Sequence, residues 1–191
     1  MMKNILFKNL LFAILIIGCS SCSTYKLFDS YESAGIKRDV LGNSRNKLYM
    51  RDDLNDVSLD PNVLTTSYRQ QLAHILVKQL PAEYPYQQLD LRQAIYVSLY
   101  FDPKDYSVME VYFSDLSDPS KSLFSRKALR SMERTIKKNL RAVPNRRFID
   151  RHLDKVRLAN STFVPHTVGF SIKQLFALKN GEITEENLLT F

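Results

Sequence analysis

Two stretches in which apolar and polar side chains alternate constrain the fold of this chain more than any other feature. In residues 94–101 the apolar positions of one face are Ile95, Val97, Leu99 and Phe101. In residues 107–114 they are Met109, Val111 and Phe113. The segment between them, from Asp102-Pro103 to Tyr106, is rich in turn-forming residues. This pattern predicts an antiparallel hairpin with one buried face.

The opposite face of the predicted hairpin carries three tyrosines, Tyr96, Tyr100 and Tyr112. Aromatic rings with a polar tip are suited to contacts with a partner or a glycan, so these residues are a candidate binding face. Two alternatives stand beside this one. The N-terminal segment can cover the tyrosines, or they can be ordinary strand residues, because tyrosine is common in strands.

Two helices are predicted around the hairpin. The first, at about residues 61–80, begins with Asp60 as N-cap and Pro61 in the first position, and Pro81 ends it. The second, at about residues 126–142, is capped by Ser125 and buries a stripe of Leu129, Met132, Ile136 and Leu140. Basic residues cover its remaining circumference and form a candidate basic patch: Arg126, Lys127, Arg130, Arg134, Lys137, Lys138 and Arg141.

A third strand is predicted at about residues 164–172, where apolar positions again alternate. His166 falls in the apolar register of this strand, so a buried imidazole with a hydrogen-bond partner is expected rather than a catalytic one. Together these elements predict an α+β fold. It comprises a small antiparallel sheet, packed by the two helices, in a single domain over residues 47–191.

The N-terminus has the parts of an export signal. Lys3 and Lys8 precede an apolar run that starts at Leu10 and ends in Leu15-Ile16-Ile17-Gly18-Cys19. The segment is too short to span a bilayer as a helix. A large aliphatic residue, a small residue and then cysteine resemble the lipobox of bacterial lipoproteins, whose cysteine is lipidated and becomes the mature N-terminus. Cys22 is a weaker candidate, because the triplet before it lacks the aliphatic residue.

The lipobox resemblance implies residues 1–18 as a signal peptide and residues 19–46 as a lipid anchor and tether. A flexible tether of that length reaches roughly 30 Å on average. The membrane is then a partner through the lipid on Cys19. Ser20 after the cysteine resembles the default for the outer membrane, so the expected location is the bacterial cell envelope, on the periplasmic face of that membrane.

The order of helix, hairpin, helix and strand also resembles the C-terminal domain of TonB-type envelope proteins. Its counterparts here are Tyr84-Pro85, the strands 95–101 and 108–114, the helix 126–142 and the strand 164–170. The turn lacks the glycine of that family, and Tyr106 lies in its place. Neither the membrane helix nor the Pro-rich rod of the energy-coupling members is present. The resemblance therefore implies the fold, and edge-strand pairing as a binding mode, without energy coupling.

Composition narrows the possible chemistry. The chain has only two cysteines, and both lie beside the proposed anchor, so neither a disulfide framework nor a cysteine-based metal site is expected. Neither a cofactor nor a metal is predicted. The formal charge of +7 falls to +5 when Lys3 and Lys8 are removed with the signal. Export from the cytoplasm argues against nucleic acid as a partner of this basic chain.

The sequence contains no recognised catalytic motif such as Gly-x-Ser-x-Gly, His-Glu-x-x-His or a phosphate-binding glycine loop. The favoured hypothesis is therefore a non-catalytic envelope protein that binds another envelope protein or a glycan. The alternative is a lipid-anchored hydrolase or carbohydrate-active enzyme. It predicts a cleft in which His166 or His152 meets a carboxylate such as Asp150 or Glu110.

Overall fold

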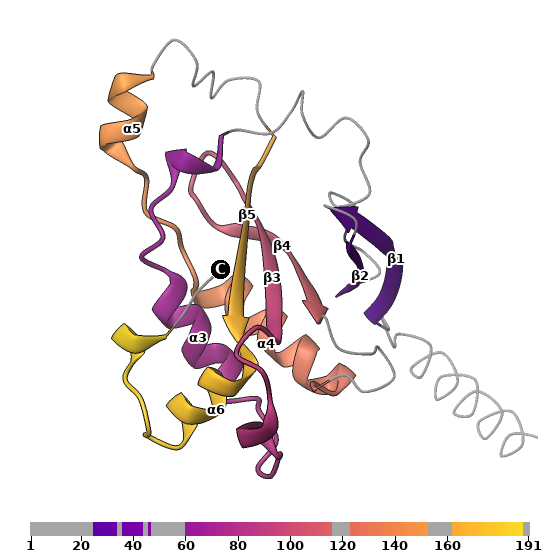
Figure 1. Cartoon of the computed structure of the whole chain (residues 1–191). Coiled ribbons are helices and arrows are strands. Elements are labelled where there is room, and N and C mark those ends of the chain that lie inside the picture. The colour runs from indigo at the N-terminus through magenta and orange to yellow at the C-terminus, as the bar shows by residue number, and fades with distance from the viewer. Residues whose placement is uncertain are drawn as a thin grey trace, which may run out of the picture.

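The computed structural model describes residues 25–33, 36–43, 46, 60–115, 123–152 and 162–188. Five strands form one antiparallel sheet in the order β1-β2-β4-β3-β5. Helices α3 (Arg69–Val77), α4 (Arg126–Asn139) and α6 (Ile172–Lys179) pack on one face of strands β4, β3 and β5 (Figure 1). The hairpin of β1 (Tyr25–Ser33) and β2 (Ile36–Asn43) lies on the side of these three strands opposite α3. The α+β fold predicted from the sequence is confirmed. The predicted signal peptide (residues 1–18) and Cys19 lie outside the described residues.

The predicted hairpin is formed by β3 (Ala94–Phe101) and β4 (Val108–Asp115). Its register runs from Ile95 opposite Asp115 to Tyr100 opposite Glu110, and it then shifts at a bulge so that Phe101 lies opposite Val108. The bulge turns Val108 into the core and leaves Met109 39% exposed. The sequence pattern had placed Met109 on the buried face, and that assignment is wrong, because strict alternation assumes a strand without an extra residue.

Tyr106 closes the turn between the two strands in the left-handed conformation, with a φ of 57°. Its N–H donates to the carbonyl of Asp102 at 2.9 Å. Glycine is the residue that usually takes this conformation, because it has no Cβ to clash with the backbone. In this turn, a tyrosine therefore occupies a position at which glycine is the usual residue.

The first predicted helix is broken in two. Asp60 does cap a helical turn, accepting a hydrogen bond from the N–H of Asn62, but that turn is a 3₁₀ helix (Pro61–Val63), and α3 begins later (Arg69–Val77). Leu64 between them is extended and forms a bridge with Pro144. The following Thr-Thr-Ser stretch has weak helix propensity, so backbone pairing with another segment prevails there. The expected continuous helix over 61–80 is therefore wrong.

The second predicted helix is α4 (Arg126–Asn139), and the Ser125 hydroxyl caps it by accepting the N–H of Ala128 at 3.1 Å. The predicted third strand is β5 (Val164–Ser171), which pairs with β3. Two helices were not predicted, α5 (Arg146–Arg151) and α6 (Ile172–Lys179). Further single 3₁₀ turns lie at Tyr86–Gln88 and Glu185–Asn187. The core between sheet and helices includes the fully buried Leu72, Leu76, Val97, Leu99, Met132, Ile136 and Phe170.

Residues 19–46 were expected to be a tether, and much of this segment is instead part of the sheet. β1 (Tyr25–Ser33) and β2 (Ile36–Asn43) form a hairpin, and β2 pairs with β4 from Asp39 to Gly42. Asn46 is buried, and its side chain donates to the carbonyl of Val111 at 2.9 Å. The predicted domain boundary at residue 47 is therefore too late. The mixed polar composition of residues 25–43 is typical of a linker and gives little indication of these two strands.

Candidate functional site

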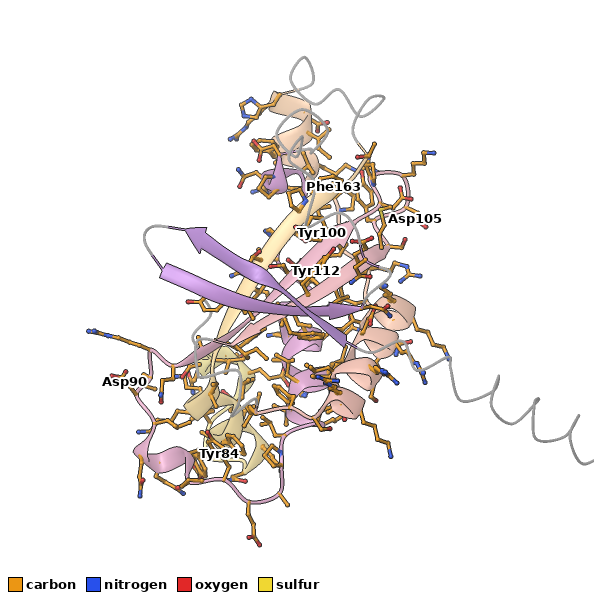
Figure 2. The ribbon with its side chains drawn as sticks, turned by 90° about the vertical axis from the view of Figure 1, so that its right-hand side faces the viewer. Tyr84, Asp90, Tyr100, Asp105, Tyr112 and Phe163 are labelled. Carbon is orange, nitrogen blue, oxygen red and sulfur yellow. The ribbon has the colours of Figure 1, made fainter. Side chains whose placement is uncertain are left out.

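Tyr100 and Tyr112 of the candidate binding face lie where the sequence places them, on the face of β3 and β4 that turns away from the helices (Figure 2). Tyr96 shares this face, because it lies four residues before Tyr100 in the same strand. They are not an exposed platform. Tyr112 is 0% exposed and Tyr100 6%, and Tyr96 is partly buried. The rings of Tyr100 and Tyr112 meet edge to face at 5.5 Å, and Tyr100 also contacts the buried Phe163 at 5.3 Å.

The N-terminal segment covers the tyrosines, which explains why they are buried. The β1–β2 hairpin crosses in front of β4, β3 and β5 in Figure 2, and Gly42 and Asn46 are buried against the sheet. The hydroxyl of Tyr112 donates to Glu110 at 2.7 Å, which satisfies its polar end. Tyr100 and Tyr112 form part of a second core layer, so the prediction that they contact a partner directly is wrong.

The basic residues of α4 gather on one flank of the helix instead of covering its whole outer surface. At 3.6 residues per turn, the six that lie within the helix fall in an arc of about 120°, whereas Arg141 follows the end of the helix, past the extended Leu140. We call this flank the basic side of α4; it consists of Arg126, Lys127, Arg130, Arg134, Lys137 and Lys138. The other flank, with Ser131, Thr135 and Asn139, faces α3, where the Gln71 side chain donates to the Asn139 carbonyl at 3.4 Å.

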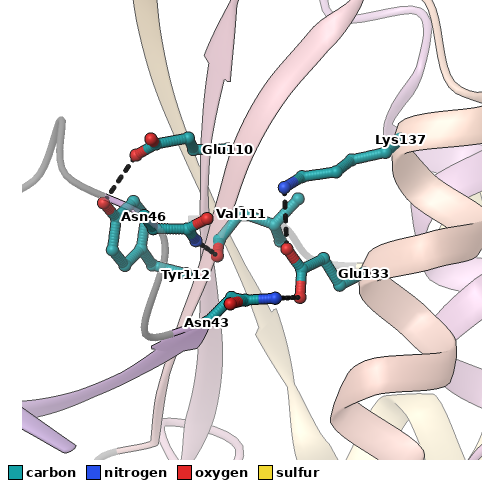
Figure 3. Close-up of polar contacts among 7 residues, drawn as sticks. All are labelled: Asn43, Asn46, Glu110, Val111, Tyr112, Glu133 and Lys137. Carbon is teal, nitrogen blue, oxygen red and sulfur yellow. Dashed lines mark hydrogen bonds and ion pairs between the residues drawn. The ribbon is translucent and has the colours of Figure 1, made fainter. Parts of the chain in front are cut away.

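A buried carboxylate joins α4 to the N-terminal hairpin (Figure 3). Glu133 is only 4% exposed, and its carboxylate pairs with Lys137 one turn along the helix at 2.7 Å. The side chain of Asn43, the last residue of β2, donates to the same carboxylate at 3.4 Å. A buried charge is costly unless it is paired and hydrogen-bonded, and here both conditions are met across the contact between two elements.

His166 projects from β5 toward the helix side, and the hydroxyl of Tyr68 hydrogen-bonds its Nδ1. Burial lowers the pKa of His166, and the nearby Arg69 charge lowers it further. Burial also raises the pKa of the Tyr68 hydroxyl far above its ordinary value. Both groups are therefore neutral near pH 7. A buried imidazole with a hydrogen-bond partner was expected; the partner is present, but the ring is only half-buried and packs edge-on against Tyr68 at 5.6 Å.

The acid–base pairs expected for an enzyme are not brought together among the described residues. His152 follows α5 and packs on the Phe148 ring at 4.5 Å, and Asp150 is exposed. Glu110 accepts the Tyr112 hydroxyl. The structure instead joins His74 of α3 to Glu185 at 2.5 Å. This pair borders an open depression of about 350 Å³ whose lining is Gln70, Thr184, Glu185 and Glu186.

Two of these features were not predicted from the sequence: the buried Glu133 and the pair of His74 and Glu185. Glu133 could have been identified, because it lies between Met132 and Ile136 on the apolar stripe of α4, where a carboxylate needs a partner. The pair of His74 and Glu185 could not have been identified from the sequence, because 111 residues separate the two and neither lies in a motif. Only the fold places the last 3₁₀ turn beside α3.

Comparison with known proteins gives distant structural similarity without a family assignment. The sequence matches no family model and no curated protein. Among solved structures, the chain is similar to the crystal structure of a DUF5043 family protein from Bacteroides uniformis, with 15% sequence identity and a TM-score of 0.46. The match covers 77% of this chain and 86% of that chain.

Proposed function

We propose that this protein is a non-catalytic, lipid-anchored component of a bacterial cell envelope, a binding or structural module held on a membrane through Cys19. The observation that carries the proposal is the sequence Leu15-Ile16-Ile17-Gly18-Cys19 behind a basic start and an apolar run. Several acyl chains on one cysteine give stable attachment, since a single chain binds a bilayer only marginally. The outer membrane, on its periplasmic face, is the proposed location.

The start of β1 limits how far such a domain stands from the membrane. Six peptide steps separate Cys19 from Tyr25, the first residue of β1, and at about 3.5 Å per step they span at most about 20 Å. The domain is then held close to the headgroups instead of being lifted by a long tether. Among the described residues, the structure has no helix long and apolar enough to cross a membrane.

The chemistry of His166 supports a binding role over a catalytic one. Its Nδ1 is bonded to the Tyr68 hydroxyl within the fold, so this nitrogen is engaged in packing and not directed at a substrate. The pair instead holds β5 against the segment that leads into α3. The partner in this proposal is another envelope protein or a glycan.

A hydrolase remains the second candidate, and the pair of His74 and Glu185 beside the open depression is the observation that favours it. A histidine oriented by a carboxylate is a common arrangement for general base catalysis. The non-catalytic proposal predicts that the wild type and His74→Asn release equal background amounts of product from purified peptidoglycan. Product released by the wild type and lost in His74→Asn would favour the hydrolase instead.

Membrane fractionation of cysteine variants tests the anchor. Cys19→Ala is expected in the soluble fraction after membranes are washed in about 1 M salt, which shortens the Debye length to about 3 Å and removes electrostatic attachment. Cys22→Ala is the matched control and is expected to stay with the membranes. Retention of Cys19→Ala after the wash, as complete as that of the control, would refute the lipid anchor.

A further inference from the structure

We infer that the basic side of α4 is a membrane-contact surface, which lies against the anionic phospholipid headgroups of the bilayer that carries the anchor. This inference rests on the proposed lipid anchor and adds to it a second, electrostatic attachment. Three observations carry it: the clustering of charge on one flank, the position of the first strand, and the absence of carboxylate partners for four of those charges among the described residues.

The clustering of charge goes beyond what folding requires. Within Arg126–Asn139, six basic residues stand against the single acidic Glu133, a net charge of +5. The residues that fold the helix are its apolar stripe and the Ser125 cap. Repulsion between like charges on one flank disfavours the isolated helix. A surface of opposite charge removes this penalty, and an anionic leaflet is such a surface.

The first strand lies beside the edge of this flank, next to the buried Glu133, whose carboxylate pairs with Lys137 of the basic side. Tyr25, the first residue of β1, pairs with Asn43 of β2, and the Asn43 side chain donates to Glu133 in the middle of α4. Cys19 lies within about 20 Å of Tyr25 along the chain. A helix of 14 residues is about 21 Å long. The lipid attachment site is therefore no farther from the start of β1 than the length of α4 itself.

The charges on this flank are available for a surface. Arg126, Lys127, Arg134 and Lys138 are exposed, and in the part of the chain that the structure describes none of them pairs with a carboxylate. Lys137 is engaged with Glu133, and the Arg141 guanidinium donates to the carbonyls of Lys137 and Leu140 at the helix end. Four cations on the flank thus remain to meet headgroups.

A second basic helix provides a matched comparison. α5 carries Arg146, Arg147 and Arg151, all exposed, at the end of the molecule far from α4 in Figure 1. Its three arginines match in charge three residues of the basic side of α4, but α5 lies far from β1, the first strand of the fold. If membrane binding depends on where the charge lies and not only on the net charge, removing three basic residues from α4 weakens binding more than removing three from α5.

Vesicle binding tests the inference without the lipid. The chain from residue 19 to 191 with Cys19→Ala contains every described strand and helix. It is mixed with vesicles of phosphatidylcholine that contain about a quarter phosphatidylglycerol, at low salt. The test variant adds Lys127→Gln, Arg134→Gln and Lys138→Gln. The control variant adds Arg146→Gln, Arg147→Gln and Arg151→Gln instead, and melting temperatures check that both variants fold.

The parent is expected to sediment with the anionic vesicles and not with pure phosphatidylcholine. Each basic residue near such a surface contributes about fivefold in affinity, so the α4 variant is expected to bind about 100-fold more weakly and the α5 control to change much less. Equal losses in the two variants, or no binding by the parent, would overturn the inference. So would α4-dependent binding to an acidic polysaccharide without binding to vesicles, which would identify a glycan partner. None of these outcomes depends on acylation of Cys19.

Discussion

Replacing Tyr112 with alanine tests whether the tyrosine face is buried, because an exposed strand residue and a core residue respond very differently. Tyr112 is 0% exposed and packs edge to face on Tyr100 at 5.5 Å. Truncation of a buried aromatic side chain to alanine costs about 3–5 kcal/mol, through lost burial and the cavity left behind. Most surface substitutions stay within about 0.5 kcal/mol.

Urea unfolding followed by circular dichroism measures the loss. At an m-value of about 2 kcal/mol/M, Tyr112→Ala is expected to lower the midpoint by about 2 M. Tyr112→Phe keeps the ring and loses only the hydrogen bond to Glu110, so a loss of about 1 kcal/mol is expected. Tyr84→Ala is the exposed control, because Tyr84 is 36% exposed and stacks on Phe176 from outside. A loss for Tyr112→Ala no greater than that for Tyr84→Ala would refute the burial of this face.

Three further substitutions test other contacts. Because burial holds the pKa of His166 in the folded chain below its ordinary value of about 6.5, the unfolded chain binds more protons near that pH, so stability is lost as pH falls from 7 to 5. His166→Gln is expected to flatten that loss in unfolding curves at several pH values, and an unchanged slope would contradict the burial effect. Asn46→Ala is expected to cost about 1–2 kcal/mol in urea unfolding, because it leaves the Val111 carbonyl without its donor; no loss would place Asn46 outside the domain. Glu133→Gln keeps the shape but removes the charge opposite Lys137, so a similar loss of about 1–2 kcal/mol is expected by the same measurement, and a gain in stability would show that burying the pair is unfavourable.

The sequence predicts the elements whose hydrophobic period is regular. The β3–β4 hairpin, α4 and β5 follow periods of two or 3.6 with clear ends such as Ser125. It fails where tertiary pairing overrides local preference, as at Leu64, whose bridge with Pro144 interrupts the predicted first helix. It also fails at the bulge that exchanges Met109 for Val108.

Two errors about the candidate site share one cause. Residues 25–43 have the composition of a linker, so their strands could not be predicted from local pattern, and their coverage of the tyrosine face was one of several open alternatives. Pairing with β4 gives those strands their stability, and such non-local pairing leaves little trace in a single sequence. In contrast, the arc of basic residues on α4 could have been derived from the sequence, because it depends only on helical spacing.

Mass spectrometry of the N-terminus of the protein purified from bacterial membranes tests the lipid anchor most directly. The account predicts that the chain begins at Cys19, without residues 1–18, and that this cysteine carries the added mass of several acyl chains. Such a modified N-terminus would place the first strand, at Tyr25, within about 20 Å of the lipid attachment. A chain that begins at Met1, or one cleaved elsewhere with an unmodified Cys19, would contradict it.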